Sequence, residues 1–262
     1  MAGNVQSKSF SRGKSSSLKG FLDKLLQRKN SADVPSPGPS TTTDNGMTDA
    51  VSMTSRVPHT LCRTTKRRLI DTIKPPNCHF QIANVLDGLP FPDNTFDYVN
   101  QRMLTFAIKE NEWPSLITEI LRVTKPNGWV EFLEFDLQSY NRGPLNTEGL
   151  KPTFYAFKSR GINPYIARKL DRFLVKAGVV NVAKDWVSIP LNWGGRLGQL
   201  FYDDVREVLI SFRPYLTKVT GLSNEEYDAK IKASLEECKE YKTYNNFYAA
   251  WGQAPDESAE KV

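Results

Sequence analysis

Two acidic residues, Glu131 and Glu134, have the residue type and close spacing that general acid–base chemistry uses. Paired carboxylates perform that chemistry when both face one cleft and their surroundings hold their pKa values apart. Both lie in an apolar run from Trp129 to Phe135 that predicts a strand. Because side chains alternate along a strand, an odd separation places the two carboxylates on opposite faces. We therefore expect no paired-carboxylate mechanism.

Metal and disulfide chemistry have few residues to use. The chain has two histidines and three cysteines, at His59, His79, Cys62, Cys78 and Cys238. No two of them are paired at the spacing of zinc ligands. An odd number of widely spaced cysteines also argues against a disulfide framework. We expect no metal site and reduced thiols.

The net positive charge comes from the start of the chain. Residues 1–29 carry seven Lys and Arg side chains against the single acidic residue Asp23, which accounts for the whole net charge of +6. The remaining chain is formally neutral, so it offers no net basic character for binding phosphates. We expect no nucleic-acid partner.

Residues 1–55 are rich in Ser, Thr, Pro and Gly, and this composition predicts a disordered tail. Within the tail, residues 17–28 have apolar side chains at helical spacing among lysines, which predicts a short amphipathic helix. Such a helix could lie on an acidic membrane surface or dock on a partner. The alternative is a transient helix in a solvated tail, because so short a helix is marginal alone.

Localisation is only loosely constrained. No apolar run approaches the roughly 20 residues that cross a bilayer, and no signal-peptide pattern is present. We expect an intracellular protein, most simply a cytoplasmic one. Membrane-surface contact and mitochondrial import stay open, because the tail is basic and Ser-rich.

From about residue 69 the pattern alternates between strands and helices, as in a layered α/β domain. Strands are predicted at 79–85, 95–100, 129–135, 187–191 and 243–251. Helices are predicted around 113–121, 163–177 and 197–212, and after a capping box formed by Ser223 and Glu226. The glycine cluster at 194–198 reads as a connecting loop, because it lacks the strand context of a phosphate-binding turn.

Two motifs carry a family resemblance: Leu-Pro-Phe-Pro-Asp-Asn-Thr-Phe-Asp at 89–97 and Arg-Val-Thr-Lys-Pro-Asn-Gly-Trp at 122–129. Together they resemble class I S-adenosylmethionine-dependent methyltransferases, in the ubiquinone-methyltransferase-like, methyltransferase type 11 branch. The resemblance implies an α/β fold over residues 56–262. It would be a partial Rossmann-like fold whose mostly parallel sheet ends in a C-terminal antiparallel hairpin. The implied cofactor is S-adenosylmethionine, with an unidentified small-molecule or protein substrate.

The resemblance also assigns candidate cofactor-binding residues. Asn84 stands where a side chain meets the adenine amino edge, and Val85 offers an apolar wall beside it. Asn100, Gln101 and Arg102 stand where the family faces the methionine moiety and the substrate, and Arg102 could pair with a carboxylate there. The alternatives are that Asn84 merely turns the chain and that Arg102 bridges to a surface acidic residue.

One expected part has no counterpart in the sequence. Family members carry a Gly-x-Gly-x-Gly turn after their first strand and an acidic residue after the second, but residues 56–77 contain no glycine. The strand predicted at 79–85 would lose its usual partner, and the fold would be incomplete or loosely held there. A methyltransferase and a non-catalytic binding or regulatory protein derived from one are both consistent with this pattern.

Overall fold

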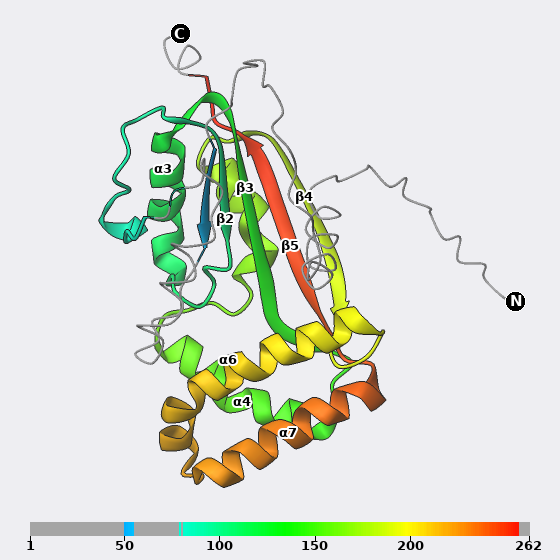
Figure 1. Ribbon diagram of the computed structural model, residues 1–262. Helices are drawn as coiled ribbons and strands as arrows, with labels where there is room; N and C mark the ends of the chain where they lie inside the picture. Colours follow the sequence, from blue (N-terminus) through cyan, green and yellow to red (C-terminus); the bar gives the residue numbers. More distant parts are fainter. Residues whose placement is uncertain (1–49, 55–78, 80, 257–262) are drawn as a thin grey trace, which may run out of the picture. The chain divides into compact units, whose positions relative to one another are not determined.

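A computed structural model describes residues 50–54, 79 and 81–256 (Figure 1). Its centre is a five-stranded sheet with the order β1-β2-β3-β5-β4. The strands are β1 (Ala50–Thr54), β2 (Phe96–Arg102), β3 (Thr124–Tyr140), β4 (Val180–Pro190) and β5 (Tyr244–Gln253). The amphipathic helix predicted at 17–28 lies outside the described residues.

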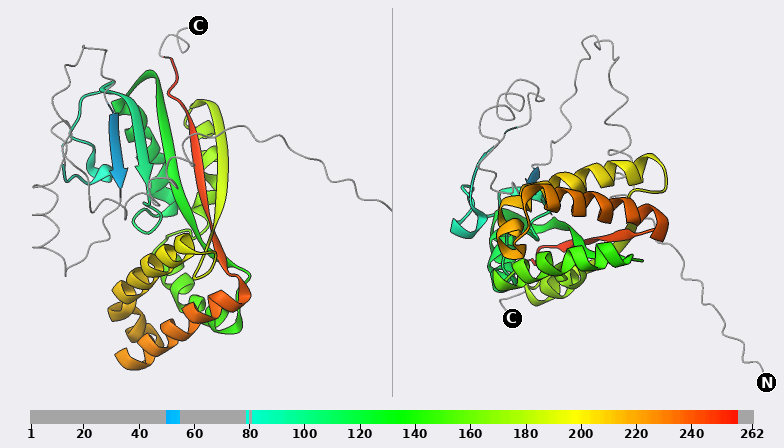
Figure 2. Two further views of the ribbon diagram at one scale, coloured as in Figure 1. Left: turned by 45° about the vertical axis from the view of Figure 1, so that its right-hand side comes forward. Right: turned by 90° about the horizontal axis from the view of Figure 1, so that it is seen from below.

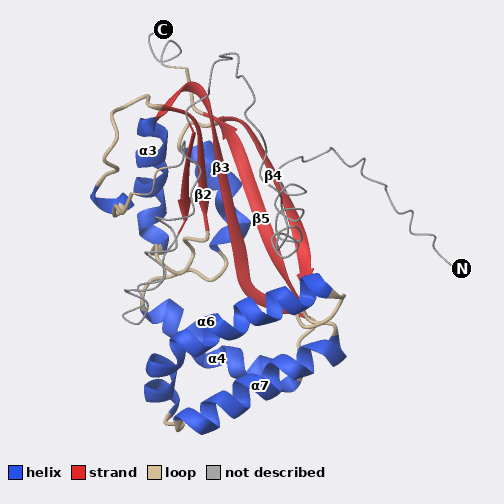
Figure 3. Ribbon diagram, viewed as in Figure 1, coloured by secondary structure: helices blue, strands red, loops and turns tan. Residues whose placement is uncertain are grey.

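The sheet is mixed. β1 and β3 pair in parallel with β2, whereas β5 pairs in antiparallel fashion with both β3 and β4. The predicted mostly parallel sheet is therefore only partly confirmed. The terminal antiparallel pair is present, but two long helices join β4 to β5 in place of a hairpin turn (Figure 3).

Helices connect the strands. The α-helices are α3 (Trp113–Val123), α4 (Pro144–Ser159), α5 (Leu170–Lys176), α6 (Arg196–Thr220) and α7 (Asn224–Tyr241). Short 3-10 helices are η1 (Val85–Asp87), η2 (Glu110–Glu112) and η3 (Ile166–Lys169). Within the described residues, none of the helices combines the length and apolarity that crossing a membrane requires.

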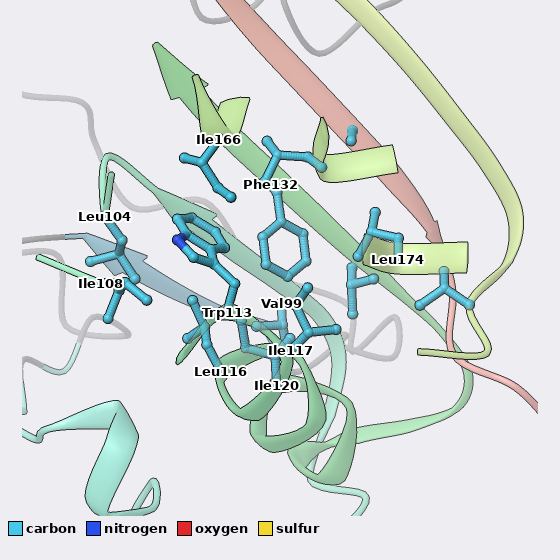
Figure 4. Packing of buried hydrophobic residues seen from close by; sticks show 14 of the residues in the cluster. Val99, Leu104, Ile108, Trp113, Leu116, Ile117, Ile120, Phe132, Ile166 and Leu174 are labelled. Atoms are coloured by element: carbon cyan, nitrogen blue, oxygen red, sulfur yellow. The ribbon is translucent and has the colours of Figure 1, made fainter. Parts of the chain in front are cut away.

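The main hydrophobic core lies between one face of the sheet and the helices α3 and α5 (Figure 4). α3 contributes apolar residues three and four positions apart, which form one continuous stripe. Burial of each large side chain contributes roughly 1.5–3 kcal/mol. Fully or almost fully buried members include Val99, Trp113, Leu116, Ile117, Ile120, Phe132, Ile166, Leu170 and Leu174.

A second group of helices packs at one end of the sheet. Figure 2 shows α4, α6 and α7 gathered there, beyond the ends of the long strands β3, β4 and β5. Phe201 of α6 contacts Phe247 of β5, on the sheet face opposite the main core. The side chains of Phe106, Phe157 and Phe212 meet nearby and join α4, α6 and the segment after β2.

Two helix signals in the sequence are confirmed in detail. Ser223 accepts from the Glu226 amide while the Glu226 side chain accepts from the Ser223 amide, so the predicted capping box starts α7. α3 begins with Trp113 and carries proline in its first turn, where a missing N–H costs nothing.

The strand predicted at 79–85 is wrong. Residues 81–84 are exposed and irregular, and η1 follows them. Asn84 explains part of the difference, because its side chain accepts from the Leu86 amide and so favours a turn over an extended chain. The edge of β2 is paired instead by β1, which lies at the end of the segment predicted to be disordered.

Two further elements differ from prediction. β3 extends well beyond 129–135, because its second half pairs with β5 as far as Tyr140. α4 was not predicted, since Gly149 and Pro152 both signal a break; it forms by packing against α6 and α7.

Candidate functional site

The carboxyl ends of the parallel strands form the candidate site. Thr54 of β1, Arg102 of β2 and Leu133 of β3 stand in register at one level of the sheet. In open α/β sheets, ligands bind in the crevice outside the carboxyl ends of the strands. The predicted residues Asn100, Gln101 and Arg102 are the last three of β2 and therefore lie at this edge.

These three residues do not share one face of the sheet. Gln101 stands beside Phe132 on the face of the main core and is fully buried, whereas Asn100 and Arg102 alternate to the other face and are half-buried. The Asn100 side chain donates to the Tyr98 hydroxyl at 3.3 Å, and that hydroxyl donates to Glu131 at 2.8 Å. Burial and the nearby Glu131 carboxylate raise the pKa of Tyr98.

Glu134 organises the segment that follows β2. Its carboxylate is fully buried and accepts from the Gln101 side chain, from the Leu104 amide at 2.6 Å, and from the amide and hydroxyl of Thr105 at 3.0 and 2.6 Å. Desolvation raises the pKa of Glu134, although each of these hydrogen bonds favours the charged form. The predicted separation of Glu131 from Glu134 is confirmed, since one contacts Tyr98 on one face and the other contacts Gln101 on the opposite face.

The backbone at this edge is unusual. Met103, directly after β2, has φ +59°, a conformation that few residues other than glycine adopt. Its amide donates to the Leu133 carbonyl at 3.0 Å, so the chain leaves β2 while still bound to β3. Positive-φ residues of this kind are held in place by their surroundings and cluster at functional sites.

Asn84 and Val85 have a different setting. Asn84 is exposed and caps η1: it accepts from the Leu86 amide at 3.3 Å and donates to Asp87 at 2.7 Å. Val85 is half-buried and packs against the main core. Both polar atoms of the Asn84 amide are therefore used locally, as the chain-turning alternative predicts.

The two resemblance motifs build a scaffold beside the site. Arg122 donates to the carbonyl oxygens of Leu89 and Phe91 at 3.1 and 2.9 Å, and Lys125 pairs with Asp97 at 3.0 Å. The second motif, which spans the end of α3 and the start of β3, therefore binds the first motif, which ends in β2. Trp113 is completely buried in the core.

A polar and aromatic cluster further along β3 was not predicted. Asp136 is completely buried and accepts from Arg168 of η3 at 2.7 Å and from the Tyr140 hydroxyl at 2.9 Å. The Arg168 guanidinium also lies 4.8 Å from the ring centre of Tyr165. Asp136 and Arg168 are 32 positions apart, so no local pattern in the sequence identifies the cluster.

Within the described part of the chain, no three His, Cys, Asp or Glu residues are grouped as metal ligands. Cys238 is a buried free thiol whose pKa burial raises to about 11. His79 is exposed. His59, Cys62 and Cys78 lie outside the described residues.

Comparison with known proteins finds that the chain is similar to methyltransferases. A family model described as a methyltransferase domain matches residues 58–128. The chain is 28% identical over 207 residues to the N-methyltransferase sirN of Leptosphaeria maculans. The aligned region covers 69% of this chain and 67% of that protein. It is 34% identical over 106 residues to the uncharacterized methyltransferase C1B3.06c of Schizosaccharomyces pombe, which covers 40% of this chain and 37% of that protein.

Among solved structures, the chain is similar to the cyclopropane synthase MmaA2 of Mycobacterium tuberculosis, with a TM-score of 0.43 and 11% identity over 71% of this chain and 64% of that chain. The chain thus spans about two thirds of sirN and little more than a third of the fission-yeast relative. The matched domain and these relatives support a class I S-adenosylmethionine-dependent methyltransferase.

Proposed function

We propose that this protein binds S-adenosylmethionine at the carboxyl edge of β1, β2 and β3 and transfers its methyl group to an acceptor nitrogen. The observation that carries the proposal is the edge itself. Three parallel strands end together there, and polar side chains of β2 stand at the level where such folds bind ligands.

The residues present at the edge fit part of the cofactor. Oε1 of Gln101 is buried without a hydrogen-bond partner, and a buried acceptor of this kind calls for a donor. An ammonium group would supply such a donor. Arg102 ends β2 and faces the other side of the sheet, so it would pair with the carboxylate of the same amino-acid moiety past the end of the strand. Asn100 would add a polar contact on the Arg102 side. Asn84 and Val85 would meet the adenine ring if the η1 cap opened.

When bound, the cofactor supplies a methyl group activated by attachment to a sulfonium. The work of the protein is then to bind, to orient and to exclude water, because nearly in-line attack gains its rate from positioning. The Glu134 carboxylate accepts from the amides of Leu104 and Thr105, and these hydrogen bonds would help to hold the backbone in position. The relative sirN is named an N-methyltransferase, which supports nitrogen as the acceptor atom.

A second function is favoured by one observation on the sequence. β1 ends at Thr54, and the following residues 55–78 contain no glycine, although the family places its glycine-rich turn after the first strand. A protein without that turn would lose close backbone approach to the cofactor. The second candidate is therefore a binding or regulatory protein derived from a methyltransferase.

Calorimetry followed by turnover distinguishes the two candidates. S-adenosylhomocysteine is titrated into the full chain and into Arg102→Ala, and methyl-labelled S-adenosylmethionine is then incubated with a panel of primary and secondary amines. We expect micromolar affinity, about tenfold weaker binding by Arg102→Ala, and amine-dependent label transfer. Binding without transfer to any amine would favour the non-catalytic protein. No binding by the wild type would contradict the proposed cofactor site.

A further inference from the structure

Glu134 is an unusual residue for a core position. Its side chain is completely buried, and its four hydrogen-bond donors are neutral groups: the amide of Gln101, the main-chain amides of Leu104 and Thr105, and the Thr105 hydroxyl. Removing a carboxylate from water is costly, and apolar residues of similar volume often serve a core better. A role in packing alone does not explain the acid.

The donors show what the carboxylate controls. Oε1 binds the last buried side chain of β2 together with the Leu104 amide, and Oε2 binds both polar groups of Thr105. One side chain of β3 therefore fixes the end of β2 and the first turn after it. The Met103 amide adds a bond to the Leu133 carbonyl at 3.0 Å, so five hydrogen bonds from this short segment reach two consecutive residues of β3.

The carboxylate also sets the orientation of the Gln101 amide. Because Glu134 accepts from Nε2, the amide oxygen Oε1 points elsewhere, and it is buried without a partner. An unsatisfied buried acceptor destabilises the free protein. A neutral group in place of Glu134 would let the amide flip and satisfy that oxygen internally.

We propose that Glu134 is a positioning residue for the cofactor: it fixes the Gln101 amide with Oε1 unpaired inside the protein and locks the backbone from Met103 to Thr105 at the binding edge. This role rests on the proposed function. In this role Glu134 does not contact the cofactor. It acts through Gln101 and the turn after β2.

Glu134→Gln in the full chain is the direct test, with S-adenosylhomocysteine as the probe. The substitution keeps shape and volume, but its NH₂ group faces the Leu104 amide or the Thr105 amide and cannot accept from it. It also offers a donor to Oε1 of a flipped Gln101. We expect S-adenosylhomocysteine to bind about tenfold more weakly. Thr105→Val, which removes one donor and leaves the main chain intact, should weaken binding about threefold.

Asp136→Asn is the matched control. Asp136 is another completely buried acid of β3, but it pairs with Arg168 and not with the end of β2. Its loss should lower the melting temperature at least as much as Glu134→Gln while leaving S-adenosylhomocysteine affinity within twofold of wild type.

Three outcomes decide between the possibilities. Weaker binding by Glu134→Gln and Thr105→Val with unchanged affinity of Asp136→Asn supports the positioning role. Wild-type affinity in both Glu134→Gln and Thr105→Val overturns that role but leaves the cofactor site standing. If the wild-type chain itself does not bind S-adenosylhomocysteine, the proposed function fails, and the role of Glu134 fails with it.

Discussion

The guanidinium of Arg122 donates to the main-chain oxygen of Leu89 across 3.1 Å, although the two residues are 33 positions apart. The same side chain reaches the Phe91 carbonyl at 2.9 Å and the carboxylates of Asp93 and Glu119, both at 2.6 Å. The residues of the two resemblance motifs thus form a structural contact, which we call the Arg122 joint: Arg122 with Leu89, Phe91, Asp93 and Glu119. They fix the loop before β2 on α3, and the candidate site lies at the opposite end of that strand.

Replacing Arg122 should open this joint. Arg122→Ala removes two hydrogen bonds to carbonyl oxygens and three to carboxylates. We expect a loss of about 2–3 kcal/mol of unfolding free energy. Arg122→Lys should recover only part, because lysine lacks the planar fork that reaches several acceptors. Urea unfolding measures both. Arg206→Ala, at an exposed pair with Glu207, is the control and should change stability by less than about 0.5 kcal/mol. Equal losses of unfolding free energy in Arg122→Ala and Arg206→Ala would contradict this role of Arg122.

The same joint makes stability depend on pH through Glu119. Its hydrogen bond with Arg122 lowers the pKa of Glu119 below the ordinary value of 4.5. A lowered folded pKa means that this stabilisation is complete well above pH 4.5 and is lost as the pH falls through the folded value. Unfolding free energies of wild type and Glu119→Gln should therefore differ most at neutral pH and converge on acidification. A constant difference between pH 7 and pH 3 would refute this assignment.

Two glycines should respond in opposite directions to alanine. A Cβ on Gly128 would lie 2.8 Å from the Lys125 carbonyl oxygen and 3.0 Å from that of Asp97, so Gly128→Ala must shift main chain and should cost roughly 1–3 kcal/mol. Gly149 lies on the exposed side of α4, where a Cβ meets only the Ser234 hydroxyl at 3.7 Å. Gly149→Ala should stabilise by about 0.5–1 kcal/mol. Thermal melts measure both variants. If the melting temperatures of Gly128→Ala and Gly149→Ala shift in the same direction, this account of the packing is wrong.

Glu237 of α7 supplies the cap that α4 lacks. The helix begins after Gly143, which has no side chain, and the Glu237 carboxylate accepts from the amides of Leu145 and Asn146 at 3.1 and 2.8 Å. Glu237→Ala should cost about 1 kcal/mol, the usual value of a helix cap. Glu237→Gln should cost less, because it keeps one acceptor and loses only the charge at the positive helix end. Chemical denaturation compares them with the exposed control Glu240→Ala, which should match wild type.

Local signals allowed much of the fold to be predicted. The stripe from Trp113 to Ile120 and the pair Ser223 and Glu226 each act within a few residues, so their helices follow from the sequence alone. The His79–Val85 strand failed because periodicity does not reveal whether a neighbouring strand is available. β1 instead takes the edge beside β2, a pairing across more than 40 positions.

The candidate site was predictable only in part. The resemblance pointed to Gln101 and Arg102 directly after the strand predicted at 95–100, and in the structure they are the last two residues of β2. It did not indicate that Gln101 and Arg102 face opposite sides of the sheet, nor that Glu134 joins Gln101 to Thr105. These relationships depend on the register between β2 and β3, which sets residues about 30 positions apart side by side.

Amide hydrogen exchange of the full chain, with and without saturating S-adenosylhomocysteine, tests the cofactor site most directly. We predict slower exchange in residues 102–108, where the chain leaves β2, and unchanged exchange in α7 at Asn224–Tyr241. Protection elsewhere with none at 102–108, or no change at any ligand concentration, would contradict a cofactor site at this edge of the sheet.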